Sequence, residues 1–491
     1  MSKLEGNLPA LPDKETLSIG SRVEMFVDPY LIDETFSVSL RLNHPRKENV
    51  AITFDQPWEG RGSGAYASFF YDGERYRAYY RANSNSKPKE KDEKRAVSCF
   101  TCLAFSDDGI HWEKPKLGLV DFDGSTENNI ILAGKMCHNF SPFYDTNPDC
   151  PPEAKYKAVS GHAKTGLTAW QSEDGLHWKT MQDEPVIREG AFDSQNLCFY
   201  DARIQAYRCY SRYFARPTKY DNVPADGKFP IPARPDTLDD LGIGVRAIQS
   251  AVSKDFLHWS EQKANTYRNG TPLEHFYTNA TIPCPGAEHI LISSPMRFLH
   301  DRHKSPHCAF AGVSDNVLMT SRDGVCFDRT FMEGWIRPEL GERNWSQRNY
   351  ISAWGLLETG PEELSMYVGE HYEWDDAGIR RYTIRRHGFA SVNAPYSGGM
   401  FTTKPFIFTG KELHINYATS AAGSIRVGIV NDGTGWPACG FGAEDCDIIY
   451  GNELDHVVTW RGSSDLSQFE GKEICLMFEM KDADLYAIQF R

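Results

Sequence analysis

The sequence predicts an all-β protein in two parts, a five-bladed β-propeller followed by a C-terminal β-sandwich. Three observations lead to this expectation. A short turn phrase recurs along most of the chain, and each copy follows an apolar strand. Beyond about residue 400 the phrase no longer occurs, although polar and apolar residues still alternate as in half-buried strands.

The repeated phrase places a serine, an aspartate and usually an aromatic residue in a fixed order. Its copies read AFSDDGIHW (104–112), WQSEDGLHW (170–178), AVSKDFLHW (251–259) and MTSRDGVCF (319–327), with a degenerate copy, TIRRHGF, at 383–389. Asp-Gly is typical of hairpin turns because glycine readily takes a positive φ, and a preceding Ser or Asp closes the turn by a hydrogen bond. The copies lie roughly 65 to 80 residues apart, which is the length of one four-stranded blade with its loops.

Five strand-rich segments recur along the chain with about the same spacing as the turn phrase. They cover residues 62–81, 137–161, 191–212, 275–295 and 343–372. The expected organisation is a lead-in over residues 1–21, the propeller over 22–397 and the sandwich over 398–491. A long Pro-rich insertion over residues 214–241 interrupts the third blade.

Composition limits the function classes. The chain has 491 residues, of which 40% are hydrophobic and 13% aromatic, and its net charge of −14 argues against nucleic acid or an anionic membrane as partner. The twelve cysteines include one CxxC spacing, Cys99 to Cys102, but no second pair to complete a set of metal ligands, so neither a metal site nor a redox motif is expected. No cofactor is expected either, although the central channel leaves room for a structural Ca²⁺ or Na⁺ ion. The N-terminal residues lack the apolar core of a signal peptide, which predicts a cytoplasmic protein, or a periplasmic or secreted one if a signal was removed.

Candidate site residues are the polar side chains at the starts of the inner strands, because these strands line the channel and meet at one end of it, together with Glu370 and His371 at the end of the strand SMYVGEHY. Three carboxylates occupy comparable blade positions and are the predicted catalytic residues: Glu59, Asp193 and Glu370. Cleavage of a glycosidic bond needs two such groups, an acid for the leaving oxygen and a base or nucleophile, and a third carboxylate raises the pKa of the acid. Asp193 is expected to be the ionised base and Glu370 the acid, its pKa raised by burial. The predicted substrate-binding residues are Asp28, His138, Asn139, Gln195, Asn196, Tyr277, Asn279, Arg297, Arg343, Arg348 and His371.

The chain resembles the five-bladed propeller glycoside hydrolases, the group of arabinanases, xylosidases, invertases and levansucrases. The resemblance rests on the blade count, the S-x-D-G-x-x-W-like turns and the trailing sandwich, which is typical of the invertase branch. It implies a glycosidase acting on a plant- or algal-type oligosaccharide or polysaccharide, with Asp193 at the place of the group's middle-blade Asp. VDPYLID (27–33) is similar to the group's NDPNG and makes Asp28 a candidate for its blade-one Asp. The chain contains neither NDPNG nor RDP, so the identity of the sugar is not implied.

Two alternatives stay open. One is a propeller that binds carbohydrate without catalysis. The other is a sialidase-like hydrolase of an acidic sugar, since sialidases repeat the turn S-x-D-x-G-x-x-W and use three arginines, a set that Arg297, Arg343 and Arg348 could imitate. The turns of this chain are one residue shorter between Asp and Gly, and five blades fit their spacing better than the six of sialidases.

Overall fold

The computed structural model describes residues 16–84, 99–215, 244–268, 271–308, 311–372, 374–431 and 437–491. Within these ranges the chain is almost entirely strand and loop, and its helical segments are short 3₁₀ turns. The predicted insertion at 214–241 lies almost wholly outside the described residues. The chain divides into two compact units: Met1–His44, Pro361–Glu363 and Ile384–Arg491 form unit 1, and Pro45–Gly360 with Leu364–Thr383 forms unit 2.

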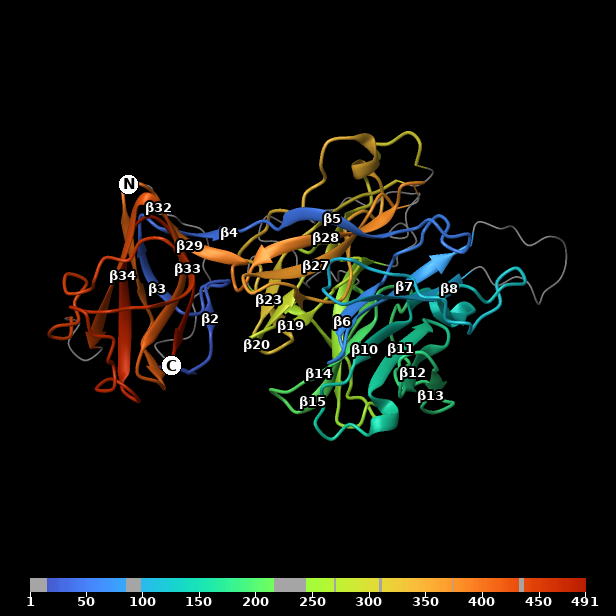
Figure 1. The fold of residues 1–491 in the computed structure, drawn as a ribbon, viewed down its shortest axis with the longest axis horizontal. Helices are drawn as coiled ribbons and strands as arrows, with labels where there is room; N and C mark the ends of the chain where they lie inside the picture. The colour runs from blue at the N-terminus through green and yellow to red at the C-terminus, as the bar shows by residue number, and fades with distance from the viewer. Residues whose placement is uncertain are drawn as a thin grey trace. The chain divides into compact units, whose positions relative to one another are not determined.

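Unit 2 is a five-bladed propeller, as predicted (Figure 1). Blades 1 to 3 are four-stranded antiparallel sheets in simple sequence order. Their strands are β6 (Ser68–Tyr71), β7 (Tyr76–Asn83), β8 (Cys99–Ser106) and β9 (Ile130–Ala133); β10 (Ser141–Tyr144), β11 (Tyr156–His162), β12 (Gly166–Ser172) and β13 (Lys179–Thr180); β14 (Leu197–Asp201), β15 (Ala206–Ala215), β16 (Val245–Ser253) and β17 (Lys263–Ala264).

Blade 4 is less regular, with a three-stranded sheet and two short strand pairs in the described residues. Its sheet is β19 (Ile282–Cys284), β20 (Ala287–Ser293) and β23 (Met319–Ser321), and the pairs are β21 (Met296–Leu299) with β22 (Val313–Asn316) and β18 (Thr266–Tyr267) with β24 (Cys326–Phe327). Blade 5 consists of β25 (Ile351–Ser352), β26 (Leu357–Glu358), β27 (Glu363–Glu370), β28 (Gly378–Arg385) and β5 (Arg46–Thr53). Because β5 comes before blade 1 in the chain but pairs with β28, it closes the ring of blades.

The repeated phrase forms the turn that the sequence predicts. In the second copy the hydroxyl of Ser172 accepts a hydrogen bond from the backbone N–H of Gly175, and Asp174 accepts from the backbone N–H groups of Leu176 and His177. The indole of Trp178 donates to the carbonyl of Gly175, so the aromatic ring packs against the turn. The copies beginning at Ser106 and Ser253 repeat these contacts.

These turns also join neighbouring blades. Tyr79 and Tyr210, at equivalent positions of the second strands of blades 1 and 3, donate their hydroxyl hydrogens to the turn carbonyls of Gly175 and Gly324 in the next blade. Tyr367 of blade 5 does the same to the corresponding glycine of blade 1. Blade 2 has Val159 at this position, and there the turn glycine of the next blade is replaced by Phe256, which is fully buried. One blade junction therefore replaces a hydrogen bond by apolar packing.

The turn aspartates predict a specific loss of stability in acid. Burial favours a higher pKa for Asp174, but hydrogen bonds from the backbone and imidazole of His177 outweigh it and hold the pKa below its ordinary value. A carboxylate whose pKa is lowered by folding stabilises the protein above its unfolded pKa of about 4, and this contribution disappears as the pH falls through the folded pKa. The Asp174→Asn variant should therefore melt below the wild type at neutral pH, and the gap should close in acid. A gap that persists unchanged to about pH 2 would contradict this assignment.

A second repeated pattern lies where the first strand of a blade ends. An aspartate there forms a buried ion pair with a cation near the start of the next strand. The pairs are Asp72 with Arg77, Asp145 with Lys157 and Asp201 with Arg208, in blades 1, 2 and 3. Each of these three cations is thus neutralised by a buried carboxylate.

Unit 1 is a ten-stranded hydrogen-bonded network in the described residues, and it closes around one hydrophobic core as a β-sandwich. Alternate residues of its long strand β34 are buried, which is the predicted alternation. The strands are β1 (Leu17–Gly20), β2 (Glu24–Met25), β3 (Ile32–Phe36), β4 (Ser39–Leu42), β29 (Ala390–Ala394), β30 (Gly399–Thr403), β31 (Phe406–Phe408), β32 (Leu413–Asn431), β33 (Asn452–Val457) and β34 (Glu473–Phe490).

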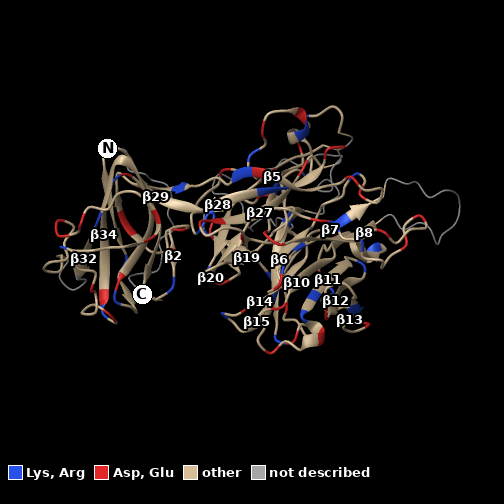
Figure 2. Ribbon diagram, in the orientation of Figure 1, with Lys and Arg blue, Asp and Glu red and all other residues tan. Residues whose placement is uncertain are grey.

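The boundaries between the two parts differ from those predicted. Residues 22–44 belong to unit 1 and not to the propeller, because β2 and β4 pair with β34 and β29 of the C-terminal region. Acidic and basic residues are interspersed along each unit (Figure 2). No helix among the described residues is long and apolar enough to cross a membrane.

Candidate functional site

Six side chains from blades 1 to 4 are connected by contacts at the end of the propeller where the first strand of each sheet begins. We call this set the pole cluster. It consists of Tyr66, Arg81, His138, Asp193, Arg212 and Tyr277.

A line of polar contacts runs through the cluster. The Arg81 Nη1 lies 3.3 Å from His138 Nδ1, and His138 Nε2 lies 2.8 Å from Asp193 Oδ1. Because a guanidinium only donates, Nδ1 accepts, and the imidazole proton resides on Nε2 and is donated to the carboxylate. Arg212 donates to the backbone carbonyl of Asp193 at 2.6 Å. The carboxylate is therefore oriented by a histidine that is itself oriented by an arginine.

Asp193 is the solvent-accessible carboxylate of this cluster. Its side chain is 65% exposed and that of His138 is 34% exposed, so both can reach a ligand from solvent. The hydrogen bond from His138, reinforced by the charge of Arg212, lowers the pKa of Asp193. The group is thus ionised at neutral pH, as expected for a base or nucleophile.

Tyrosine rings form the apolar part of the cluster. The guanidinium carbon of Arg81 lies 5.4 Å from the ring centre of Tyr66, and that of Arg212 lies 5.4 Å from the ring centre of Tyr277. Burial raises the pKa of Tyr66 far above its ordinary value, so its hydroxyl keeps its proton. Flat rings beside hydrogen-bonding groups suit the mixed apolar and hydroxylated surface of a sugar.

Strained backbone occurs in the loops that lead into the inner strands. Tyr66 has a φ of 59° and Arg348 a φ of 57°. Residues other than Gly, Asn and Asp rarely adopt this left-handed backbone conformation. Arg348 donates to the hydroxyl of Tyr372 at 3.1 Å, and Arg81 donates to the same oxygen at 3.0 Å. Such strain collects at binding and catalytic sites, where the surrounding structure maintains it.

Glu59, one of the predicted catalytic residues, is placed inside blade 1. Its side chain is fully buried and forms an ion pair with Lys114 at 2.5 Å. It also accepts hydrogen bonds from the Tyr80 hydroxyl and from the backbone N–H groups of Asp55 and Gln56. These contacts hold the loop between β5 and β6.

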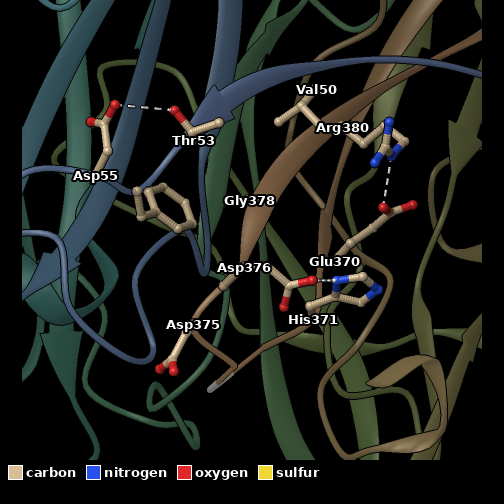
Figure 3. A pocket seen from close by; sticks show the side chains of 11 residues that line it. Val50, Thr53, Asp55, Glu370, His371, Asp375, Asp376, Gly378 and Arg380 are labelled. Carbon is tan, nitrogen blue, oxygen red and sulfur yellow. Dashed lines mark hydrogen bonds and ion pairs between the residues drawn. The ribbon is translucent and has the colours of Figure 1, made fainter. Parts of the chain in front are cut away.

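Glu370 lies in different surroundings, on the wall of a cavity of about 420 Å³ that also includes Asp55 and His371 (Figure 3). The carboxylate accepts hydrogen bonds from Arg380 at 2.7 Å and from the Tyr382 hydroxyl at 2.5 Å. The prediction that burial raises its pKa is wrong. Burial acts in that direction, but the contacts with Tyr382 and Arg380 outweigh it and lower the pKa.

The three predicted carboxylates therefore have separate sets of partners. His138, Asp193 and Tyr277 belong to the pole cluster, and Arg348 is linked to it through Tyr372. The predicted amides are buried and donate hydrogen bonds to backbone carbonyls of strands and loops: Asn139, Gln195, Asn196 and Asn279.

The remaining predicted residues have other partners. Arg297 pairs with Asp315 and Glu274 in blade 4. Arg343 and His371 both contact Asp376 in the loop after β27. Asp28 belongs to unit 1, where its carboxylate accepts a hydrogen bond from the backbone of Tyr30. The VDPYLID segment is therefore not part of the propeller.

Sequence reasoning missed Tyr66, Arg81 and Arg212. The two arginines lie near the ends of second strands, whereas most of the predicted residues lie at the starts of inner strands. A signal was present in the repeat, because YRAYYR (76–81) and YRCYSR (207–212) align with an arginine at the last position. Among the described His, Cys, Asp and Glu residues, no group of three or more is placed to hold a metal ion.

Together, the fold and the pole cluster define a propeller with a polar, partly aromatic surface at one end.

No family model and no curated protein matches the chain. Solved structures similar to it include a glycoside hydrolase (11% identity, TM-score 0.43, covering 70% of this chain and 92% of that one). They also include a Bombyx mori GH32 β-fructofuranosidase (8%, 0.41, 90% and 94%). A third is an N-acetylgalactosamine deacetylase of F. plautii in complex with blood group B trisaccharide (12%, 0.39, 71% and 96%). Similarity at this level does not define a shared activity.

Proposed function

We propose that the protein cleaves a glycosidic bond at the pole cluster. The observation that carries the proposal is the contact between His138 and Asp193, which presents an ionised, solvent-accessible carboxylate beside tyrosine rings and arginines. In the proposed reaction Asp193 either activates a water molecule or attacks the anomeric carbon. His138 and Arg212 keep the carboxylate ionised, and the hydrogen bond from His138 fixes its direction.

The proton for the leaving oxygen is assigned by the sequence to Glu370. In the present arrangement this carboxylate is ionised and paired with Arg380, so a role as acid requires that pair to open when substrate binds. The ion pair between Glu59 and Lys114 supports a structural role for this carboxylate. The catalytic roles of both residues remain predictions.

A propeller that binds carbohydrate without cleaving it is the second candidate. The observation in its favour is that two of the three predicted carboxylates are buried in ion pairs. Binding would then use the same rings and guanidiniums, and Asp193 would serve as a hydrogen-bond acceptor for sugar hydroxyls.

A screen with aryl glycosides and with plant and algal oligosaccharides separates the two candidates. Release of new reducing ends by the wild type, lost in Asp193→Asn, is the expected result. Saturable binding of an oligosaccharide without any release of reducing ends would instead select the binding protein. The Asp193→Asn protein also excludes a contaminating hydrolase as the source of the activity.

A further inference from the structure

The second strands of blades 1 and 3 each carry two buried arginines with different environments. Arg77 and Arg208, near the strand starts, pair with Asp72 and Asp201. Arg81 and Arg212, near the strand ends, are only 6% and 7% exposed. In the part of the chain that the structure describes, neither of these two forms an ion pair with a carboxylate. On each of these strands, one buried arginine is thus paired with an aspartate and the other has no ion-pair partner.

The hydrogen bonds of the two arginines within the described residues do not saturate their donors. Arg81 donates to the carbonyl of Gly62 and the hydroxyl of Tyr372 and contacts His138, and Arg212 donates to the backbone carbonyl of Asp193. The Nε atom of each is buried and has no hydrogen-bond partner among the described residues. A buried guanidinium without a counterion destabilises a fold unless something outside the fold compensates it.

Both arginines belong to the pole cluster, whose described members include one carboxylate, that of Asp193. The two positive charges exceed its single negative charge, although the chain as a whole has a net charge of −14. Contacts join the three charged groups, because Arg81 contacts His138, His138 hydrogen-bonds Asp193, and Arg212 donates to the backbone carbonyl of Asp193. Guanidiniums with free donors are the groups that proteins use to bind carboxylate, sulfate and phosphate oxygens.

We infer that Arg81 and Arg212 bind an oxyanion carried by the substrate, and that the sugar at the pole cluster is acidic, with a carboxylate on the ring. This inference rests on the proposed function for the location of the sugar but not on its cleavage. An anionic sugar supplies the missing counterion, whereas a neutral sugar would leave the excess positive charge of the cluster buried and uncompensated. Free inorganic phosphate offers the same chemistry, so the test must distinguish the two sources.

The test measures binding by calorimetry, independently of turnover. Galacturonate and glucuronate oligosaccharides are compared with their neutral galactose and glucose counterparts and with inorganic phosphate. The acidic sugars should bind the wild type, and the neutral ones should bind at least about tenfold more weakly. Arg81→Met and Arg212→Met should each weaken binding of the acidic sugar about 10- to 100-fold, the range for hydrogen bonds to charged groups.

Two controls make the result specific. Arg188→Met removes the same charge from a surface ion pair with Glu184 and should leave binding unchanged. Arg77→Met leaves Asp72 buried without its cation and should lower the melting temperature, whereas Arg81→Met and Arg212→Met should leave it unchanged or raise it.

Equal binding of acidic and neutral sugars, or binding of phosphate alone, would overturn the inference. Binding of an acidic sugar without release of reducing ends would leave the inference intact and reject the proposed hydrolase. Cleavage of a neutral sugar by the wild type would support the proposed hydrolase and reject the inference of an acidic sugar.

Discussion

Replacing Asp193 by asparagine should lower kcat on a true substrate by about two or more orders of magnitude, the scale of positioned acid–base catalysis. Asparagine keeps the shape of the side chain and can still accept the hydrogen bond from His138, but it cannot take a proton or attack carbon. Folding lowers the pKa of Asp193, so its replacement removes some stability at neutral pH, but because the side chain is 65% exposed the melting temperature should fall only slightly. Steady-state kinetics together with melting curves check both statements.

Asp183→Asn is the matched control, since it makes the same chemical change at an exposed aspartate of the propeller. It should retain the kcat of the wild type. A near-normal kcat in Asp193→Asn would remove Asp193 from the chemistry and favour the carbohydrate-binding alternative.

The variant Glu59→Gln should have a lower free energy of unfolding than the wild type but a similar kcat. It leaves Lys114, whose side chain is only 18% exposed, with the exposed carboxylate of Asp55 as its remaining ion-pair partner. Breaking a buried ion pair from one side costs about 3–5 kcal/mol, and the contact with Asp55 should keep the loss near or below the lower end of this range. Urea denaturation should show this loss, and the kcat of the molecules that remain folded should stay within a few-fold of the wild type.

The double variant Glu59→Gln/Lys114→Met tests the cause. It removes both charges, so it should recover much of the stability that the single variant loses. A Glu59→Gln protein of wild-type stability but without activity would support instead the catalytic role predicted from the sequence.

Local signals made the propeller predictable. The turn phrase specifies its own hydrogen bonds within seven residues, as in Ser172 to Trp178, and its spacing gives the number of blades. The boundaries were not predictable in the same way. Whether residues 22–44 join the propeller or the sandwich depends on pairing such as that of Glu24 with Ile488, which no local pattern encodes.

The candidate site was predictable in part for a related reason. His138 and Asp193 lie at the starts of inner strands, so the expected topology brought them together. Glu59 lies in the loop before β6 and Glu370 is the last residue of β27, and Lys114 and Arg380 come from other segments and neutralise them. Sequence position can place a carboxylate at the correct end of a blade, but it cannot reveal which cation folds back onto it.

The closing strand β5 has a consequence for how the chain is made. It leaves the ribosome before blade 1, yet its partner β28 belongs to the last blade, so the ring cannot close until nearly four-fifths of the chain has been synthesised. Unit 1 depends even more on the end of the chain, because β2, β29, β30, β31 and β32 all pair with the C-terminal strand β34. The propeller can therefore close only late in translation, and unit 1 only after β34 has emerged. A chain that stops short of residue 473 would lack the strand against which the sandwich assembles, and its early strands would remain exposed to other chains.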